Sequence, residues 1–134
     1  MENKDADQIV KRWFIDLDWY QQNNRSFIIL AQRCLCSKCR KQLEVDKAEF
    51  PVDELLANIQ DCCSREADYI TDGLPVLESV FRLFLANGNQ PLGLEELSRQ
   101  LSDWRGGGSY RTSAVTLSRL LENDQYYGLR QAIG

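Results

Sequence analysis

Apolar residues recur every three or four positions along most of the chain, which is the spacing of one face of an α-helix. In the first half this pattern predicts helices over residues 7–22, 27–33 and 53–64. Asp5 or Asp7 is placed to cap the first helix, and Ser26 to cap the second. Pro51 adjoins the start of the third helix, where a missing N–H group is tolerated. The charged segment 44–50 is poorly periodic and predicts a loop or a short hairpin.

The pattern changes after a predicted turn at residues 71–73, which we interpret as the boundary between two units, 1–70 and 71–134. Three further helices are predicted at 74–86, 94–103 and 112–123, and a short β-prone segment follows at 125–130. The residues of the last helix expected in the core are Val115, Leu117, Leu120 and Leu121. Those expected on its exposed side are Thr116 and Arg119. The sequence therefore predicts a mainly α fold.

Five cysteines and no histidine define the candidate chemistry of the 134-residue chain. Cys36 and Cys39 are separated by two residues, and Cys62 and Cys63 form a second pair, which is the arrangement of a four-thiolate structural zinc site. Cys34 is the spare, although its spacing also allows it to replace one of the four. An iron–sulfur cluster and inert or redox-active thiols remain as alternatives. The lack of histidine excludes imidazole ligands and every histidine-based catalytic triad.

Basic residues surround the first cysteine pair, and we expect them to offset the negative charge of a zinc tetrathiolate. They are Arg33, Lys38, Arg40 and Lys41. A zinc ion with four protein ligands has no open position at which to activate water, so we expect a structural role and no enzyme activity.

The chain has no apolar run long enough to span a membrane and no export-type leader, so we expect a cytoplasmic protein without membrane contact. Thiols are kept reduced in that compartment, which disfavours structural disulfides. The net charge of −4 gives no general attraction to nucleic acid. Arginine is nevertheless enriched towards the C-terminus, at positions 99, 105, 111, 119 and 130.

The stretch LPVLESVFRLFLANGNQPLGLEELSRQL, residues 74–101, resembles the HARE-HTH family of winged helix-turn-helix domains. The shared features are an apolar first helix, a turn like that at residues 88–92, and a second helix with a Glu-Leu pair. This family occurs in an RNA polymerase accessory subunit and in chromatin proteins. The resemblance implies a third helix presented to a partner. The family closes with two strands and a glycine-rich turn, whereas here only residues 126–129 remain, so the β wing is expected to be very short.

These observations lead to three hypotheses. We favour a non-enzymatic, transcription-associated interaction protein, in which a zinc-stabilised helical half packs on a winged-helix-like half that docks on RNA polymerase or other transcription machinery. The alternative is a sequence-specific DNA-binding regulator. In either case the contact residues expected at the third helix are Arg111, Thr112, Ser113, Thr116 and Arg119. The third hypothesis is a thiol redox protein that uses Cys36 and Cys39.

Overall fold

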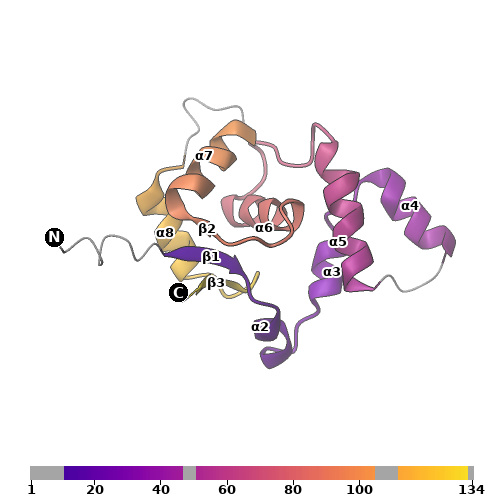
Figure 1. Ribbon diagram of the computed structural model, residues 1–134, viewed down its shortest axis with the longest axis horizontal. Coiled ribbons are helices and arrows are strands. Elements are labelled where there is room, and N and C mark those ends of the chain that lie inside the picture. Colours follow the sequence, from indigo (N-terminus) through magenta and orange to yellow (C-terminus); the bar gives the residue numbers. More distant parts are fainter. Residues whose placement is uncertain (1–10, 47–50, 105–111, 133–134) are drawn as a thin grey trace.

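The computed structural model describes residues 11–46, 51–104 and 112–132, which form a mainly helical fold with a small three-stranded sheet (Figure 1). The elements in chain order are β1 (Arg12–Ile15), α2 (Leu17–Gln22), α3 (Phe27–Gln32), α4 (Ser37–Asp46), α5 (Val52–Asp61), the 3₁₀ helix η1 (Cys63–Arg65), α6 (Val76–Ala86), β2 (Leu92–Gly93), α7 (Leu94–Trp104), α8 (Ala114–Glu122) and β3 (Leu129–Ala132). No helix in these described ranges is long and apolar enough to cross a bilayer.

The predicted helix over residues 7–22 is wrong in its first part, because Arg12–Ile15 forms strand β1. The alternation of buried Trp13 and Ile15 with the half-buried Phe14 also fits the two-residue period of a strand. Helix α2 begins only after Asp16, whose side chain accepts a hydrogen bond from the backbone N–H of Asp18 (3.1 Å). The proposed caps at positions 5 and 7 lie outside the described residues.

Strand β1 is the central strand of the sheet, whose order is β2-β1-β3 with both pairings antiparallel. Trp13 lies opposite Leu92 on one side, and Ile15 lies opposite Leu129 on the other. Asn89 holds the end of the strand, since its side chain accepts from the Ile15 N–H (2.8 Å) and donates to the Ile15 carbonyl (2.9 Å). The segments 1–70 and 71–134 therefore share one sheet and one hydrophobic core.

Helix α6 lies at the centre of this core and contacts α5 on one side and α7 and α8 on the other (Figure 1). Its side chains Val80, Phe81 and Phe84 are fully buried, as the apolar spacing predicts. From α8, Leu117 and Leu121 are buried, whereas Val115 is 70% exposed, so its predicted place in the core is wrong. Each residue advances about 100° around a helix, which places a side chain two positions before Leu117 on the far side.

Three predictions in the cysteine-bearing half need adjustment. Part of segment 44–50 is helical, because α4 continues to Asp46, and the remainder lies outside the described residues. Helix α5 ends at Asp61, and η1 follows it. Leu55 and Ile59 are buried as expected, while Leu56 is only half-buried.

We predict that Gly128→Ala lowers the free energy of unfolding by about 3 kcal/mol, measured by urea denaturation. Gly128 has a φ of +67°, and an added Cβ would lie 2.7 Å from the ring of Tyr20 and 3.0 Å from that of Trp19. The matched control is Gly73→Ala, where the nearest atom would lie at 3.7 Å. Equal effects of the two substitutions would contradict this packing.

Candidate metal centre

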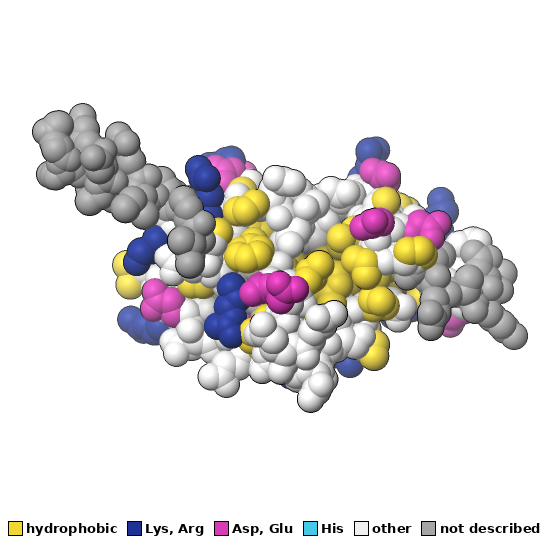
Figure 2. Space-filling model, turned by 60° about the horizontal axis from the view of Figure 1, so that its bottom comes forward, with side chains coloured by type: hydrophobic (Ala, Val, Ile, Leu, Met, Phe, Trp, Pro, Cys, Tyr) yellow, Lys and Arg dark blue, Asp and Glu magenta, His cyan; other side chains and the backbone are white. Residues whose placement is uncertain are grey.

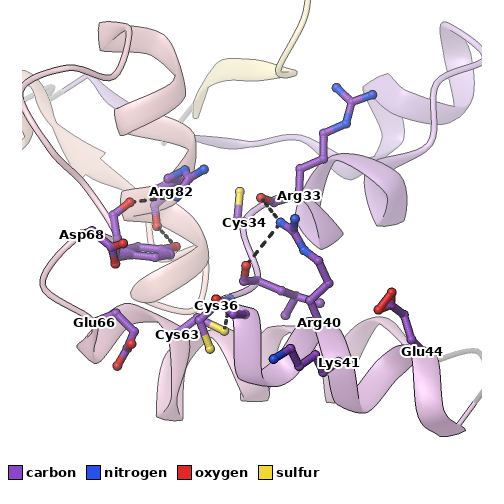
Figure 3. Close-up of a pocket in the computed structure, with 13 residues that line it drawn as sticks. Arg33, Cys34, Cys36, Arg40, Lys41, Glu44, Cys63, Glu66, Asp68 and Arg82 are labelled. Carbon is purple, nitrogen blue, oxygen red and sulfur yellow. Dashed lines mark hydrogen bonds between the residues drawn. The ribbon is translucent and has the colours of Figure 1, made fainter.

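Four cysteine thiols from two separate parts of the chain meet beside the α3–α4 turn. Cys36 directly precedes α4 and Cys39 lies in its first turn, whereas Cys62 follows α5 and Cys63 begins η1. The sulfur atoms of Cys36, Cys39 and Cys62 all lie within 4.8 Å of one another. The fourth thiol is joined to them because the backbone N–H of Cys36 donates to Sγ of Cys63 (3.2 Å; Figure 3). The two sequence pairs thus form one cluster that could bind a metal.

The sulfur separations match a single bound ion better than a disulfide. Four sulfurs at about 2.3 Å from a tetrahedral zinc lie about 3.8 Å from each other. The Sγ atoms of Cys36 and Cys62 are 3.9 Å apart. A disulfide requires about 2.05 Å, and all five cysteines are free thiols.

Local backbone geometry explains how each pair converges. The carbonyl of Cys36 accepts the N–H of Arg40 (2.9 Å), so Cys36 and Cys39 occupy positions i and i+3 of the first turn and lie on the same side of α4. At the other pair, Cys62 has φ −126° and ψ −64°, which ends α5 and turns the chain. This break allows the adjacent residues Cys62 and Cys63 to point their sulfurs at the same centre.

The thiols of Cys36, Cys39 and Cys63 differ in acidity. Burial opposes ionisation of Cys36, yet its pKa is lowered because the backbone N–H of Cys39 and the neighbouring thiols donate hydrogen bonds to its sulfur. Burial raises the pKa of Cys39, and so do its hydrogen bonds to the other three thiols. Burial also raises the pKa of Cys63. Of these three thiols Cys36 therefore has the lowest pKa, and a bound cation would displace protons from the others.

Cys34 lies apart from this cluster. It is 5% exposed, and its thiol donates to the carbonyl of Leu30 (3.7 Å) within the preceding turn. Figure 3 shows its sulfur directed away from Cys36 and Cys63. Burial raises the pKa of the Cys34 thiol to about 11. These features match the spare cysteine of the sequence prediction.

Two of the basic residues expected to offset thiolate charge are engaged elsewhere. The guanidinium of Arg40 donates to the carbonyls of Arg33 (3.1 Å) and Leu35 (3.4 Å) and so fastens the turn between α3 and α4 (Figure 3). The side chain of Arg33 points to the hydroxyl of Tyr126 (3.4 Å). Sequence reasoning missed the structural role of Arg40, for which the spacing gave no signal.

A cavity of about 400 Å³ adjoins the cluster and is lined by Cys34, Cys36, Cys63, Tyr69 and Arg82, together with further charged residues (Figure 3). Of the four clustered cysteines, Cys36 and Cys63 line this cavity. The cavity therefore borders one side of the candidate metal centre.

Two of the five residues predicted as contacts at the third helix, Thr112 and Ser113, make hydrogen bonds within the fold. The carbonyl of Thr112 accepts from the Ser98 hydroxyl (2.7 Å). Ser113 is the N-cap of α8, and its hydroxyl accepts from the backbone N–H of Thr116 (3.2 Å). Thr116 and Arg119 are exposed as predicted. Arg111 lies outside the described residues, so α8 brings two of the five to an accessible surface.

Comparisons of the chain with protein-family models, curated proteins and solved structures gave no match. The chemistry of the cysteine cluster is therefore inferred from its own geometry.

We predict that Cys36→Ser and Cys62→Ser each abolish stoichiometric metal binding, whereas Cys34→Ala retains one ion per chain. The physical reason is that only the first two remove a sulfur from the cluster. Native mass spectrometry with elemental analysis measures the number of metal ions bound per chain. Loss of the ion in Cys34→Ala, with the chain still folded, would contradict the assignment of the spare cysteine.

Proposed function

We propose that this chain is a non-enzymatic regulatory protein whose N-terminal helices are held by a structural zinc ion. Its C-terminal helices would form a winged-helix-like module that docks on transcription machinery. The observation that carries the proposal is the convergence of four cysteine thiols at single-ion spacing.

The donor set favours zinc over the alternatives. Thiolates are soft ligands that suit zinc and iron–sulfur centres. In an iron–sulfur cluster at most two of the cysteines share an iron, so a third sulfur would lie farther away than the 4.8 Å within which Cys36, Cys39 and Cys62 all lie. A redox role is disfavoured because helix α3, and not a strand, precedes the Cys36–Cys39 pair. Four thiolates also saturate a zinc ion, which supports a structural and non-enzymatic role.

Helix α4 has little else to anchor it. None of its described side chains, residues 37–44, is buried, and only Cys39 and Leu43 pack against the core. An ion bound by Cys36 and Cys39 on one side and by Cys62 and Cys63 on the other would attach α4 to the end of α5. The expected contribution is on the order of 10 kcal/mol, which exceeds what two half-buried side chains provide.

The order of the C-terminal elements supports the winged-helix-like part of the proposal. Helix α6, strand β2, helices α7 and α8 and strand β3 follow the order of a winged helix. The family closes with a second wing strand, and here strand β1 from the N-terminal region lies beside β3 instead. This arrangement would leave α8 without a long wing beside it, consistent with the short wing that the sequence predicts.

The surface of α8 favours a protein partner. Val115 is 70% exposed and borders a shallow hollow of about 430 Å³ that Leu94, Ala114, Arg119 and Glu122 also line. An apolar centre with a charged rim is the usual anatomy of a protein interface. A duplex-binding helix needs several basic contacts, and Arg119 is the one basic side chain within the described helix α8. Sequence-specific DNA binding therefore stays the weaker candidate.

A second exposed apolar region lies over α3 and α5, where hydrophobic side chains gather on the face shown in Figure 2. Ile29 is 55% exposed, and Ile28, Val52 and Leu56 are half-buried. Exposed apolar patches of this kind mark interaction sites more often than ligand pockets. The exposed apolar regions on α8 and over α3 and α5 both support the proposal that this chain binds other proteins.

We predict that removing the ion with a chelator strongly reduces hydrogen-exchange protection in α4, with little loss in α6. Helix α4 has few buried contacts of its own, whereas α6 lies within the core. Exchange measured by mass spectrometry on the zinc-loaded and chelated chain tests this. Unchanged protection of α4 after complete zinc removal would contradict the structural role.

We predict direct binding to purified RNA polymerase of the organism that carries the gene, weakened at least about tenfold by Val115→Asp. The introduced charge would have to be desolvated at the centre of the contact. Leu17→Asp is the matched control, because Leu17 is also exposed (41%) but lies on α2. Tight binding to a specific duplex, with no affinity for the polymerase, would favour the DNA-binding alternative.

A further inference from the structure

Three arginines and two aromatic rings form a surface that neither the metal centre nor α8 includes. We call it the arginine–tyrosine surface and define it as Trp19, Arg25, Arg33, Tyr126 and Arg130. The guanidinium of Arg25 lies 4.1 Å from the ring centroid of Tyr126, and Arg33 donates to the Tyr126 hydroxyl (3.4 Å). Arg25 and Arg130 lie 6.0 and 5.9 Å from the ring centroid of Trp19. Tyr126 is 39% exposed, whereas Trp19 is 5% exposed, so Tyr126 is the ring of this surface that a ligand can reach.

The arginines of this surface form no ion pair within residues 11–46, 51–104 and 112–132, where the ion pairs found involve Arg82 or Arg99. Arg33 and Arg130 are exposed and Arg25 is half-buried, so all three have hydrogen-bond donors available to a ligand.

A hollow of about 300 Å³ opens beside Arg33 and Tyr126. Its other walls include the rings of Phe81 and Tyr127 and the carboxylate of Glu78. Glu78 accepts a hydrogen bond from Arg82 through one oxygen (3.2 Å), and a carboxylate has further acceptor positions. The hollow thus offers flat apolar walls, a donor and an acceptor, which together suit a planar heterocycle that carries both kinds of group.

The loop that carries Tyr126 is held in place before any ligand arrives. The buried carboxylate of Asp124 accepts the backbone N–H groups of Tyr126 (3.0 Å), Tyr127 (3.1 Å) and Leu129 (2.9 Å). The hydroxyl of Tyr20 donates to the carbonyl of Tyr127 (2.6 Å). A rigid loop reduces the conformational entropy lost on binding.

We propose that the arginine–tyrosine surface binds single-stranded nucleic acid. The guanidinium groups contact backbone phosphates, while an unpaired base enters the hollow against Tyr126 and Tyr127. Proteins hold single strands with cationic side chains that follow the backbone and with exposed rings on which bases stack, since every base has a face that can stack. A duplex keeps its bases stacked inside and cannot use the hollow.

The hollow also argues against an acidic peptide as the ligand. A base can donate to Glu78 through an N–H group, such as N3–H of uracil and thymine, whereas a peptide carboxylate at that position would be repelled. The proposed function, docking through α8, is independent of this surface, so either can fail without the other.

Fluorescence anisotropy with labelled oligo(U) and oligo(dT), twelve nucleotides long, tests the proposal on the zinc-loaded chain. A twelve-base-pair duplex and an acidic peptide that contains tyrosine are measured alongside. We expect both single strands, or one of them, to bind more tightly than the duplex and the peptide. With three phosphate contacts, the slope of log K against log salt concentration should be about −2. Preference between the two strands shows whether RNA or DNA is the better ligand.

Substitutions test whether the arginine–tyrosine surface is the site that binds the single strand. Replacing both Arg25 and Arg33 with glutamine should weaken binding at least about tenfold and reduce the salt slope to about −0.7. Arg99→Gln is the matched control, since it removes an exposed arginine from α7 without changing affinity. Arg119→Gln tests whether α8 binds the strand instead. Tyr126→Leu should weaken binding, whereas Tyr126→Phe keeps the ring and most of the affinity, with circular dichroism confirming the fold of each variant. Binding that needs Arg119, survives the Arg25 and Arg33 substitutions, or is stronger for the peptide would overturn the proposal.

Discussion

Convergence of four thiols is the constraint on which the position of helix α4 depends. Helix α4 is charged and contributes only two half-buried side chains to the core, so hydrophobic burial alone holds it weakly. Its position is set where Cys36 and Cys39 meet Cys62 and Cys63 at the break after α5. Arg40 adds to this by fastening the carbonyls of the α3–α4 turn. A metal ion at the centre would convert these weak attachments into one strong one.

This anchored region is continuous with the rest of the molecule. Helix α6 packs between α5 on the side of the cysteines and α7 and α8 on the other, and strand β1 completes the sheet beside β2 and β3 (Figure 1). The metal centre, the exposed face of α8 and the arginine–tyrosine surface thus project from one shared core. Such an arrangement suits a protein that holds several binding surfaces in fixed relation, which is the role we propose.

Local sequence signals predicted some features well and others poorly. Helices α6 and α7 follow strong apolar periodicity, and the cysteine pairing follows from the short spacing of Cys36 and Cys39 and the lack of histidine. Strand β1 was missed because its apolar residues fit both a helix and a strand. Its conformation is decided by distant partners, Leu92, Leu129 and the side chain of Asn89. The roles of Arg40 and Asp124 depend on backbone groups that only the folded chain brings within reach.

The central claim is that the four thiolates share one ion, and X-ray absorption at the zinc edge of the purified chain tests it most directly. The account predicts a single shell of four sulfur atoms at about 2.3 Å, with no nearby second metal. A shell containing oxygen or nitrogen atoms, or fewer than four sulfurs per zinc, would contradict it.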